Sequence, residues 1–328
     1  MAIDSLQKIS INNSEQWILV RGKNEHAPLL LQVQAGPGLP HICYAEAMQK
    51  NLTWENDYLV VYWDQRGCGK SYSKHTDPAT INLQQSADDI LACAKYLLKT
   101  YHQKKITLIG YSLGATAALM AVSKDSSLFN NVVLVGIDID LARATKYAFK
   151  FGREQALKRN DAKIVKQIEK IENKPVVNAK LFEQRAKIIS RYGGIVVTKT
   201  YNQLFIDAIK YLWQSKAYTF KDILKTVKGI EFCQNALLPR IENLNLFEYE
   251  IYTTLPIHFV QGAKDAIAPM ELMQSYFKHL NIPNSTLSVF ENSAHMPQLE
   301  QPQKFYQLLK TILKKNEISG AMSTSNIK

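Results

Sequence analysis

The sequence has few cysteines and no long apolar run, and each absence narrows the class of protein. Its 328 residues include only four cysteines, Cys43, Cys68, Cys93 and Cys233. They form no Cys-x-x-Cys pair and have no close histidine partner, so we expect no metal site and read them as reduced thiols of a cytoplasmic protein. No run of about 18 apolar residues is present, so we expect neither a membrane span nor a membrane partner.

The first residues lack the basic segment and apolar stretch of a secretory signal, which also favours a cytoplasmic location. The composition, 46% hydrophobic and 21% charged, is that of an ordinary globular protein that can bury a core. The length fits one large domain or a core that carries an insertion.

Positive charge is concentrated in the middle third of the chain. The net charge is +11, and residues 141–250 hold 21 Lys and Arg against 11 Asp and Glu, a difference of +10. Such a surface is one that nucleic acids bind. However, Lys163, Lys166 and Lys170 alternate with Ile164 and Ile168, as on the solvated face of an amphipathic helix. No zinc-finger or RNP-like motif accompanies them, so we expect no nucleic-acid partner.

Short apolar runs alternate with helical patterns over the first 137 residues. The runs that predict strands lie at 17–20, 29–33, 58–63, 106–109 and 132–135. Helical patterns begin at residue 86 and cover 115–120, between the later strands. Strand, helix and strand in succession predict an α/β fold with a parallel sheet and helices on both faces.

The alternation stops in the middle of the chain, where helices with polar and basic faces are interrupted at Lys174-Pro175 and Gly193-Gly194. Strand signals resume at 256–260 and 286–290, and a last helix is expected from about 302 to 315. We therefore divide the chain into a first core part (1–137), a helical cap insertion (138–251), a second core part (252–316) and a disordered tail (317–328). The insertion is expected over the carboxyl ends of the strands, where open α/β sheets bind ligands.

Three loops carry a serine, an aspartate and a histidine in that order. Gly-Tyr-Ser-Leu-Gly at 110–114 follows an apolar run and precedes an Ala-rich helical pattern, the context of a nucleophile on a sharp strand-to-helix turn. Asp265 follows the run 256–260, and His295 follows the run 286–290. A serine hydroxyl needs a base to remove its proton, and the base needs a carboxylate to orient it. This order is that of α/β-hydrolases, and it predicts Ser112, Asp265 and His295 as catalytic residues.

Each of these residues also has a structural interpretation. Ser112 fits an ordinary strand–turn–helix corner, Asp265 fits an exposed turn, and a lone loop histidine is usually a surface residue. The pairing of His295 with Asp265, one strand earlier, favours catalysis. Leu113, which follows the nucleophile, is expected to donate one backbone N–H to an oxyanion hole, and the loop at 34–38 is expected to supply the second.

The segment Asp-Gln-Arg-Gly-Cys-Gly-Lys-Ser at 64–71 ends like a phosphate-binding loop. That motif needs a glycine five residues before Gly69, and position 64 is Asp, so the match fails. We expect Asp64 and Arg66 instead to brace the loop through a buried, hydrogen-bonded pair.

Together with residues 16–22 and 35–38, this segment and the three loops resemble the proline iminopeptidase-like branch of the α/β-hydrolase superfamily. The likeness covers about 10–137 and 252–315. It implies an α/β-hydrolase fold, mostly parallel with an inserted helical cap, and no cofactor. It also implies Ser112 as nucleophile, Asp265 and His295 as its partners, and the backbone N–H groups of Ala35 and Leu113 as the oxyanion hole.

The chain departs from that family at specific positions. Gln34-Ala35 stands where the family has His-Gly, and Leu113 stands where true iminopeptidases usually carry Trp. The family places acidic groups in the cap to hold the substrate amine, whereas this cap is basic, and none of Glu169, Glu172 or Glu183 aligns with that role. Specificity for an N-terminal proline therefore does not follow.

We predict a cofactor-free serine hydrolase that acts on a peptide or another small molecule through an acyl-enzyme. The resemblance favours an iminopeptidase-like aminopeptidase slightly, and a carboxylesterase on small acyl esters is the alternative. A hydrolase-shaped binding protein with little turnover is a further hypothesis. The sequence gives no oligomeric state.

Overall fold

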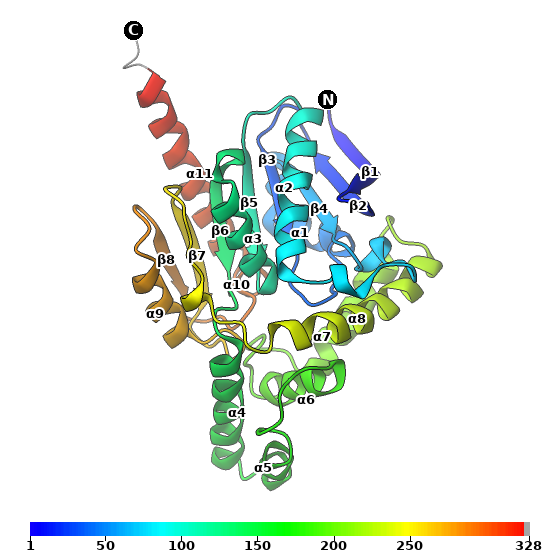
Figure 1. The fold of residues 1–328 in the computed structure, drawn as a ribbon, viewed down its shortest axis with the longest axis vertical. Coiled ribbons are helices and arrows are strands. Elements are labelled where there is room, and N and C mark those ends of the chain that lie inside the picture. Colours follow the sequence, from blue (N-terminus) through cyan, green and yellow to red (C-terminus); the bar gives the residue numbers. More distant parts are fainter. Residues whose placement is uncertain (325–328) are drawn as a thin grey trace.

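A single eight-stranded sheet is the centre of this computed structural model, which describes residues 1–324 (Figure 1). Its strands lie in the order β1-β2-β4-β3-β5-β6-β7-β8. The strands are β1 (Ile3–Ile11), β2 (Ser14–Gly22), β3 (Leu29–Val33), β4 (Leu59–Asp64), β5 (Ile106–Tyr111), β6 (Phe129–Val135), β7 (Ile257–Gly262) and β8 (Thr286–Phe290). β1 pairs antiparallel with β2 and β2 with β4, and all other neighbours are parallel. The predicted α/β fold with a mostly parallel sheet is confirmed.

The sequence reasoning missed strand β1. It forms a hairpin with β2 through Asn12 and Asn13, whose φ angles of 44° and 60° are left-handed. Asparagine tolerates this conformation, which two-residue hairpin turns require. Ile9 and Ile11 are buried and alternate with exposed residues, so the signal of a half-buried strand was present.

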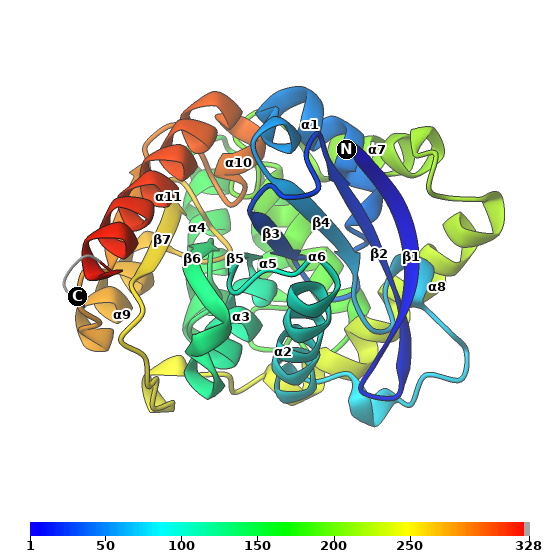
Figure 2. The same cartoon turned by 90° about the horizontal axis from the view of Figure 1, so that it is seen from above.

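Helices cover both faces of the sheet (Figure 2). α2 (Leu83–Thr100), α3 (Leu113–Lys124) and α9 (Met270–Leu280) pack on one face, and α1 (Ala45–Leu52) and α11 (Pro302–Thr324) on the other. The central strands are therefore buried on both sides, and in β3 Leu29 and Leu31 face one core while Leu30 faces the other. This double coverage explains why these strands read as continuous apolar runs.

Five helices are inserted between β6 and β7, beyond one end of the sheet (Figure 1). They are α4 (Leu141–Lys158), α5 (Ala162–Glu169), α6 (Ala179–Ser190), α7 (Tyr201–Gln214) and α8 (Phe220–Ile241). Capping boxes begin the last two: Thr200 exchanges hydrogen bonds with Gln203, and Thr219 with Asp222. Such boxes satisfy free N–H groups and fix where a helix starts.

Short elements complete the chain. A four-residue helix, α10 (Pro297–Glu300), precedes α11, and the 3₁₀ turns are η1 (Ile42–Tyr44), η2 (Trp54–Asn56), η3 (Gly69–Ser71), η4 (Pro78–Thr80), η5 (Ser126–Leu128) and η6 (Leu246–Glu248). Helix α11 ends at Thr324, so it overlaps the segment 317–328 for which we predicted disorder. A helix already nucleated by packing extends at little cost, which accounts for the overlap. Residues 325–328 lie outside the described part of the chain.

None of the helices within residues 1–324 has the length and apolar character needed to cross a membrane. Over the same residues no group of three or more His, Cys, Asp or Glu side chains could hold a metal ion. The four cysteines are buried free thiols.

Candidate active site

Ser112 lies on a sharp turn between strand β5 and helix α3. Its φ of 54° and ψ of −128° are unusual for any residue but glycine, and such strain persists only where the surroundings enforce it. Here the Ser112 N–H donates to the carbonyl of Val135 on the neighbouring strand at 2.9 Å. The turn presents the serine side chain at the carboxyl end of the sheet, beneath the inserted helices.

Gly114 lets the loop at 34–38 approach the start of helix α3. A Cβ atom at this position would lie 2.1 Å from the carbonyl oxygen of Gln34 and 2.7 Å from that of Val33. Leu113 opens the helix, where an N–H has no acceptor within the helix. Neither its N–H nor that of Ala35 donates to a loop carbonyl or a side chain among the described residues. The two N–H groups remain the prediction for the oxyanion hole.

Asp265 and His295 are brought together by the ends of β7 and β8. Oδ2 of Asp265 lies 2.8 Å from Nδ1 of His295 and also accepts from Nε2 of Gln261 at 2.8 Å. Its Oδ1 accepts from the backbone N–H groups of Ile267 at 2.8 Å and Ala268 at 2.9 Å. Each oxygen of the carboxylate thus has two partners, and within residues 1–324 no hydrogen bond engages Nε2 of His295. This is the arrangement that a general base requires.

The electrostatic environment of His295 favours its charged form. Burial alone would lower the pKa of the imidazole, but the negative charge and hydrogen bond of Asp265 outweigh burial. Asp138 adds a second negative charge, and Arg185 opposes it with a positive one. The net effect is that the pKa of His295 is raised above its ordinary value.

A segment of the insertion bonds to the loops that carry Asp265 and His295. The N–H of His295 donates to the carbonyl of Ile195 at 2.9 Å, and that of Ala266 donates to Gly194 at 3.0 Å. The carboxylate of Glu300 accepts from the N–H groups of Val197 at 2.7 Å and Ala294 at 2.8 Å. In the sequence, Gly193-Gly194 indicates only an interruption between helices. The contacts show that residues 194–197 bridge the two loops.

Asp138 is a site residue that the sequence reasoning missed. It follows strand β6, is 3% exposed, and its Oδ2 accepts a hydrogen bond from Oγ of Ser112 at 2.9 Å. Among the described residues Ser112 Oγ has this bond and none to His295. Burial raises the pKa of Asp138, while His295, the bond from Ser112 and Arg185 lower it in part. Asp138 follows the carboxyl end of β6, the parallel neighbour of β5, and this position in the sequence could have indicated that it lies near Ser112.

Arg185 on helix α6 is the second charged residue that the sequence reasoning missed. Its side chain is buried, and Nη1 donates to Oγ1 of Thr145 at 2.8 Å. Burial lowers the pKa of the guanidinium, and the charge of Asp138 opposes that effect. Because 21 basic residues lie between 141 and 250, composition gave no means of distinguishing this one.

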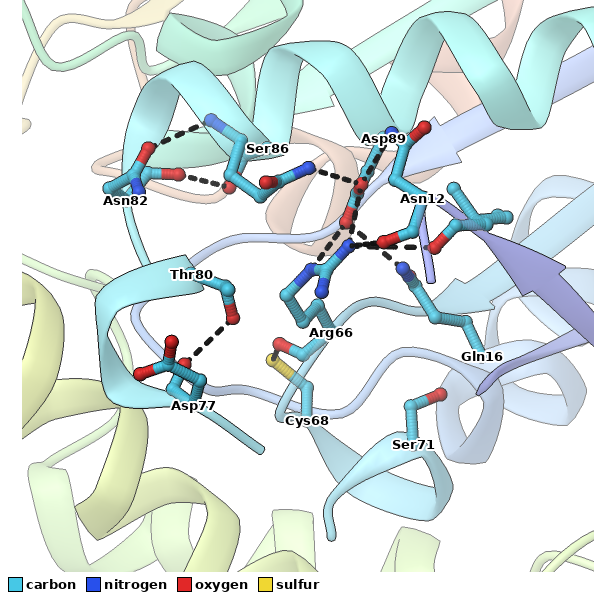
Figure 3. A network of polar contacts seen from close by, with 12 residues as sticks. Asn12, Gln16, Arg66, Cys68, Ser71, Asp77, Thr80, Asn82, Ser86 and Asp89 are labelled. Atoms are coloured by element: carbon cyan, nitrogen blue, oxygen red, sulfur yellow. Dashed lines mark hydrogen bonds and ion pairs between the residues drawn. The ribbon is translucent and has the colours of Figure 1, made fainter. Parts of the chain in front are cut away.

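The expected pair of Asp64 and Arg66 is wrong. Arg66 instead binds Asp89 of helix α2 with two parallel contacts, Nε to Oδ2 at 2.8 Å and Nη2 to Oδ1 at 3.0 Å (Figure 3). Asn12 and Gln16 donate to the same carboxylate at 2.8 and 2.9 Å. The chain leaves strand β4 at Asp64, so the two side chains no longer share a face and each finds another partner.

Asp64 stabilises the start of the segment 64–71 and its contact with the insertion. It accepts from the backbone N–H groups of His41 at 2.8 Å, Ile42 at 3.0 Å and Lys70 at 2.8 Å, and from the hydroxyl of Tyr218. The ammonium of Lys70 lies 2.7 Å from Asp222 of helix α8. The most distinctive motif of the sequence therefore anchors the insertion to the core.

The mostly parallel sheet and the serine on a strand-to-helix turn are typical of α/β-hydrolases, and comparison with known proteins gives the same family. The chain belongs to the alpha/beta hydrolase fold family, whose sequence model matches residues 28–302. It is a hydrolase, and the resemblance noted from the sequence is confirmed by its relatives.

One relative is the probable aminopeptidase YbaC of Bacillus subtilis, which is 26% identical over 94% of this chain and 96% of its own length. Among solved structures, the proline iminopeptidase of Mycobacterium smegmatis has a TM-score of 0.67 and 18% identity, covering 96% of this chain and all of that chain. An esterase from Rhodococcus sp. ECU1013 has a TM-score of 0.60 and 17% identity, covering 94% and 98%. Both structures share the fold with this chain.

Proposed function

We propose that this hydrolase is a serine aminopeptidase similar to the proline iminopeptidases, which releases the first residue of small peptides. Ser112 Oγ attacks the carbonyl carbon while Nε2 of His295 accepts the hydroxyl proton and Asp265 orients the imidazole. The N–H groups of Ala35 and Leu113 stabilise the negative charge on the substrate oxygen, each by about 3–4 kcal/mol. His295 then protonates the leaving amine, and water releases the acyl group from Ser112.

The carboxylate of Asp138 is the observation that carries the preference for a free-amine substrate. In an N-terminal residue the amine nitrogen lies about 2.5 Å from the carbonyl carbon, two bonds away. That carbon sits about 3–3.5 Å from the attacking oxygen. An acceptor 2.9 Å from Ser112 Oγ is therefore within reach of the substrate ammonium. A charged hydrogen bond from the ammonium replaces that of Ser112 and frees the hydroxyl to turn toward His295.

The three glutamates of the insertion that the sequence offered for the substrate amine support this assignment, because their carboxylates are engaged elsewhere. Glu172 lies 2.6 Å from Arg153, and Glu169 lies 3.7 Å from the same guanidinium. Glu183 lies 2.8 Å from Lys187 on the same helix. Asp138, in the turn between strand β6 and helix α4, instead accepts a hydrogen bond from Ser112. The near full-length similarity to a probable aminopeptidase favours the same substrate class.

Two other functions are each favoured by one observation. A carboxylesterase on small acyl esters fits the same serine, histidine and aspartate, because their geometry does not depend on a substrate amine, and a Rhodococcus esterase shares the fold. A ligand-binding protein with little turnover fits the hydrogen bond of Ser112 to Asp138 rather than to His295.

A substrate panel tests the proposal. We expect turnover of the p-nitroanilides of proline and alanine, and none of N-acetylproline p-nitroanilide, which lacks the ammonium group. The p-nitrophenyl esters of acetate and octanoate test the esterase alternative. Turnover of the esters alone would refute the aminopeptidase, and failure of every substrate, together with no labelling by a fluorophosphonate probe, would favour the binding protein.

A further inference from the structure

Helix α6 of the insertion carries a buried cation, Arg185. Arg185 is 3% exposed, and its one side-chain hydrogen bond, to Thr145, uses Nη1. Its Nε is a buried donor without an acceptor. No carboxylate of the described residues lies within the 4.0 Å of Arg185 that would define an ion pair. The edge of the guanidinium formed by Nε and Nη2 is therefore unused.

A guanidinium in this position is costly for the protein. Removal of a charge from water is compensated only by an ion pair or a full set of hydrogen bonds. The ring of Phe182, 5.3 Å from the guanidinium, compensates in part. Ala186, the residue after Arg185, belongs to the same apolar cluster as Ala266 and Met296, which follow Asp265 and His295 directly. Helix α6 therefore packs against both loops, and the charge of Arg185 acts on Asp138 and on His295. A buried guanidinium Nε left without an acceptor beside two such loops suits the binding of an anion.

We propose that Arg185 binds the free carboxylate of the substrate and that the site therefore takes free dipeptides. This inference rests on the aminopeptidase function proposed above. The ammonium of the dipeptide binds Asp138, its peptide carbonyl lies at Ser112, and its carboxylate accepts two hydrogen bonds from Nε and Nη2 of Arg185. Guanidinium and carboxylate match each other in this side-by-side geometry.

The chemistry of the leaving group places the terminal carboxylate of the dipeptide on the side of His295. His295 protonates the nitrogen of the second residue, so that residue lies next to the imidazole. In a dipeptide the terminal carboxyl carbon is two bonds from that nitrogen, about 2.5 Å away. Helix α6, which carries Arg185, packs against the residue after His295 through the cluster of Ala186 and Met296, so its guanidinium lies on the side of this carboxylate. The site is also enclosed, with Ser112 7% and His295 6% exposed, which suits a short substrate.

Arg185 has a simpler possible role, the electrostatic balance of Asp138. The two roles differ in one measurable respect. Charge balance acts on every substrate that uses Asp138, whether or not the substrate has a carboxylate. Recognition of the carboxylate acts only on substrates that carry one.

The test compares prolyl-alanine with prolyl-alaninamide, which lacks only the negative charge. For the natural protein we expect kcat/KM to be about tenfold to a hundredfold higher for the free acid, the range of a hydrogen-bonded charge pair. In Arg185→Gln this preference falls to about one, through loss of activity on the acid. Arg185→Lys keeps the charge without the paired donors and should retain part of the preference.

Each possible result decides whether Arg185 recognises the substrate carboxylate or only balances the charge of Asp138. The preference is a ratio measured on one preparation, so a partly folded variant does not change it. An equal loss on acid and amide in Arg185→Gln, or no preference in the natural protein, would overturn the inference while leaving the aminopeptidase intact. If neither compound nor prolyl p-nitroanilide is cleaved by the natural protein, the aminopeptidase proposal itself fails.

Discussion

Ser112 donates its hydroxyl hydrogen bond to Asp138, 2.9 Å away, while His295 is bonded to Asp265 at 2.8 Å. The proposed nucleophile and the proposed base are thus each held by a different buried carboxylate. Both carboxylates raise the pKa of His295, which burial alone would lower. Asp138 therefore influences the reaction in two ways, through the serine proton and through the basicity of the imidazole.

The first prediction concerns pH. His295 acts as a base only when neutral, so the reactivity of Ser112 should fall as the pH drops below the pKa of His295, which lies above its ordinary value of about 6.5. Asp138→Asn removes a negative charge that favours the imidazolium, so the pKa of His295 falls. We expect the acid limb of the fluorophosphonate labelling rate to move to lower pH.

A matched control for this shift is Asp140→Asn. Asp140 is also buried and lies two residues further on, but its carboxylate caps helix α4 by accepting from the N–H of Arg143 at 2.9 Å. It is not among the main causes of the raised pKa of His295. Its substitution should leave the labelling profile unchanged. An equal displacement in both variants, or a displacement of Asp138→Asn to higher pH, would contradict the account.

The second prediction concerns the orientation of the imidazole. Asp265→Asn keeps the size of the side chain but gives it an N–H donor where His295 needs an acceptor. The ring is then held in the wrong tautomer, and kcat should fall about ten-thousandfold. Because Nε2 of Gln261 loses its acceptor at the same atom, the thermal unfolding temperature should fall as well. Steady-state kinetics and calorimetry measure the two quantities. A loss of kcat below tenfold would show that Asp265 does not orient the base.

The third prediction concerns the loop beside the nucleophile. Gly114→Ala puts a Cβ atom 2.1 Å from the carbonyl oxygen of Gln34, and neither backbone can yield without separating the loop from helix α3. The N–H of Ala35 then loses its position, and kcat should fall about a hundredfold or more. Turnover by the folded fraction of the variant is the quantity to measure. Unchanged kcat would place the oxyanion hole elsewhere.

The fourth prediction concerns stability. Arg66→Ala leaves the carboxylate of Asp89 buried without its cation, and loss of one partner of such a pair costs about 3–5 kcal/mol. Arg153→Ala is the control, since its contact with Glu172 is partly exposed and should cost less than about 1 kcal/mol. Urea unfolding of both variants measures the difference. Equal midpoints would show that the Arg66 pair adds no stability.

Much of the framework could be predicted because its signals are local. Buried parallel strands appear as apolar runs, and the seven predicted runs coincide with β2 to β8. The three loops with Ser112, Asp265 and His295 lie at the carboxyl ends of such strands, so the sheet brings them to one edge. The contact between Asp265 and His295 follows from that placement.

The residues that were missed depend on distant contacts. Asp138 and Asp140 both follow strand β6, and only the three-dimensional turn decides that the first reaches Ser112 while the second caps a helix. Arg185 is one basic residue among many on the insertion, and its burial follows from helix packing. Arg66 binds Asp89, 23 positions away, in preference to the neighbouring Asp64. Pairing of charges is not encoded in spacing alone.

The central claim is that Ser112 is an activated nucleophile, and mass spectrometry of the protein after treatment with a fluorophosphonate tests it most directly. We predict one adduct per chain, located on the peptide that contains Ser112, and none in Ser112→Ala, whose kcat should also fall by about a millionfold. An unmodified natural protein, or an adduct on a different residue, would contradict the account.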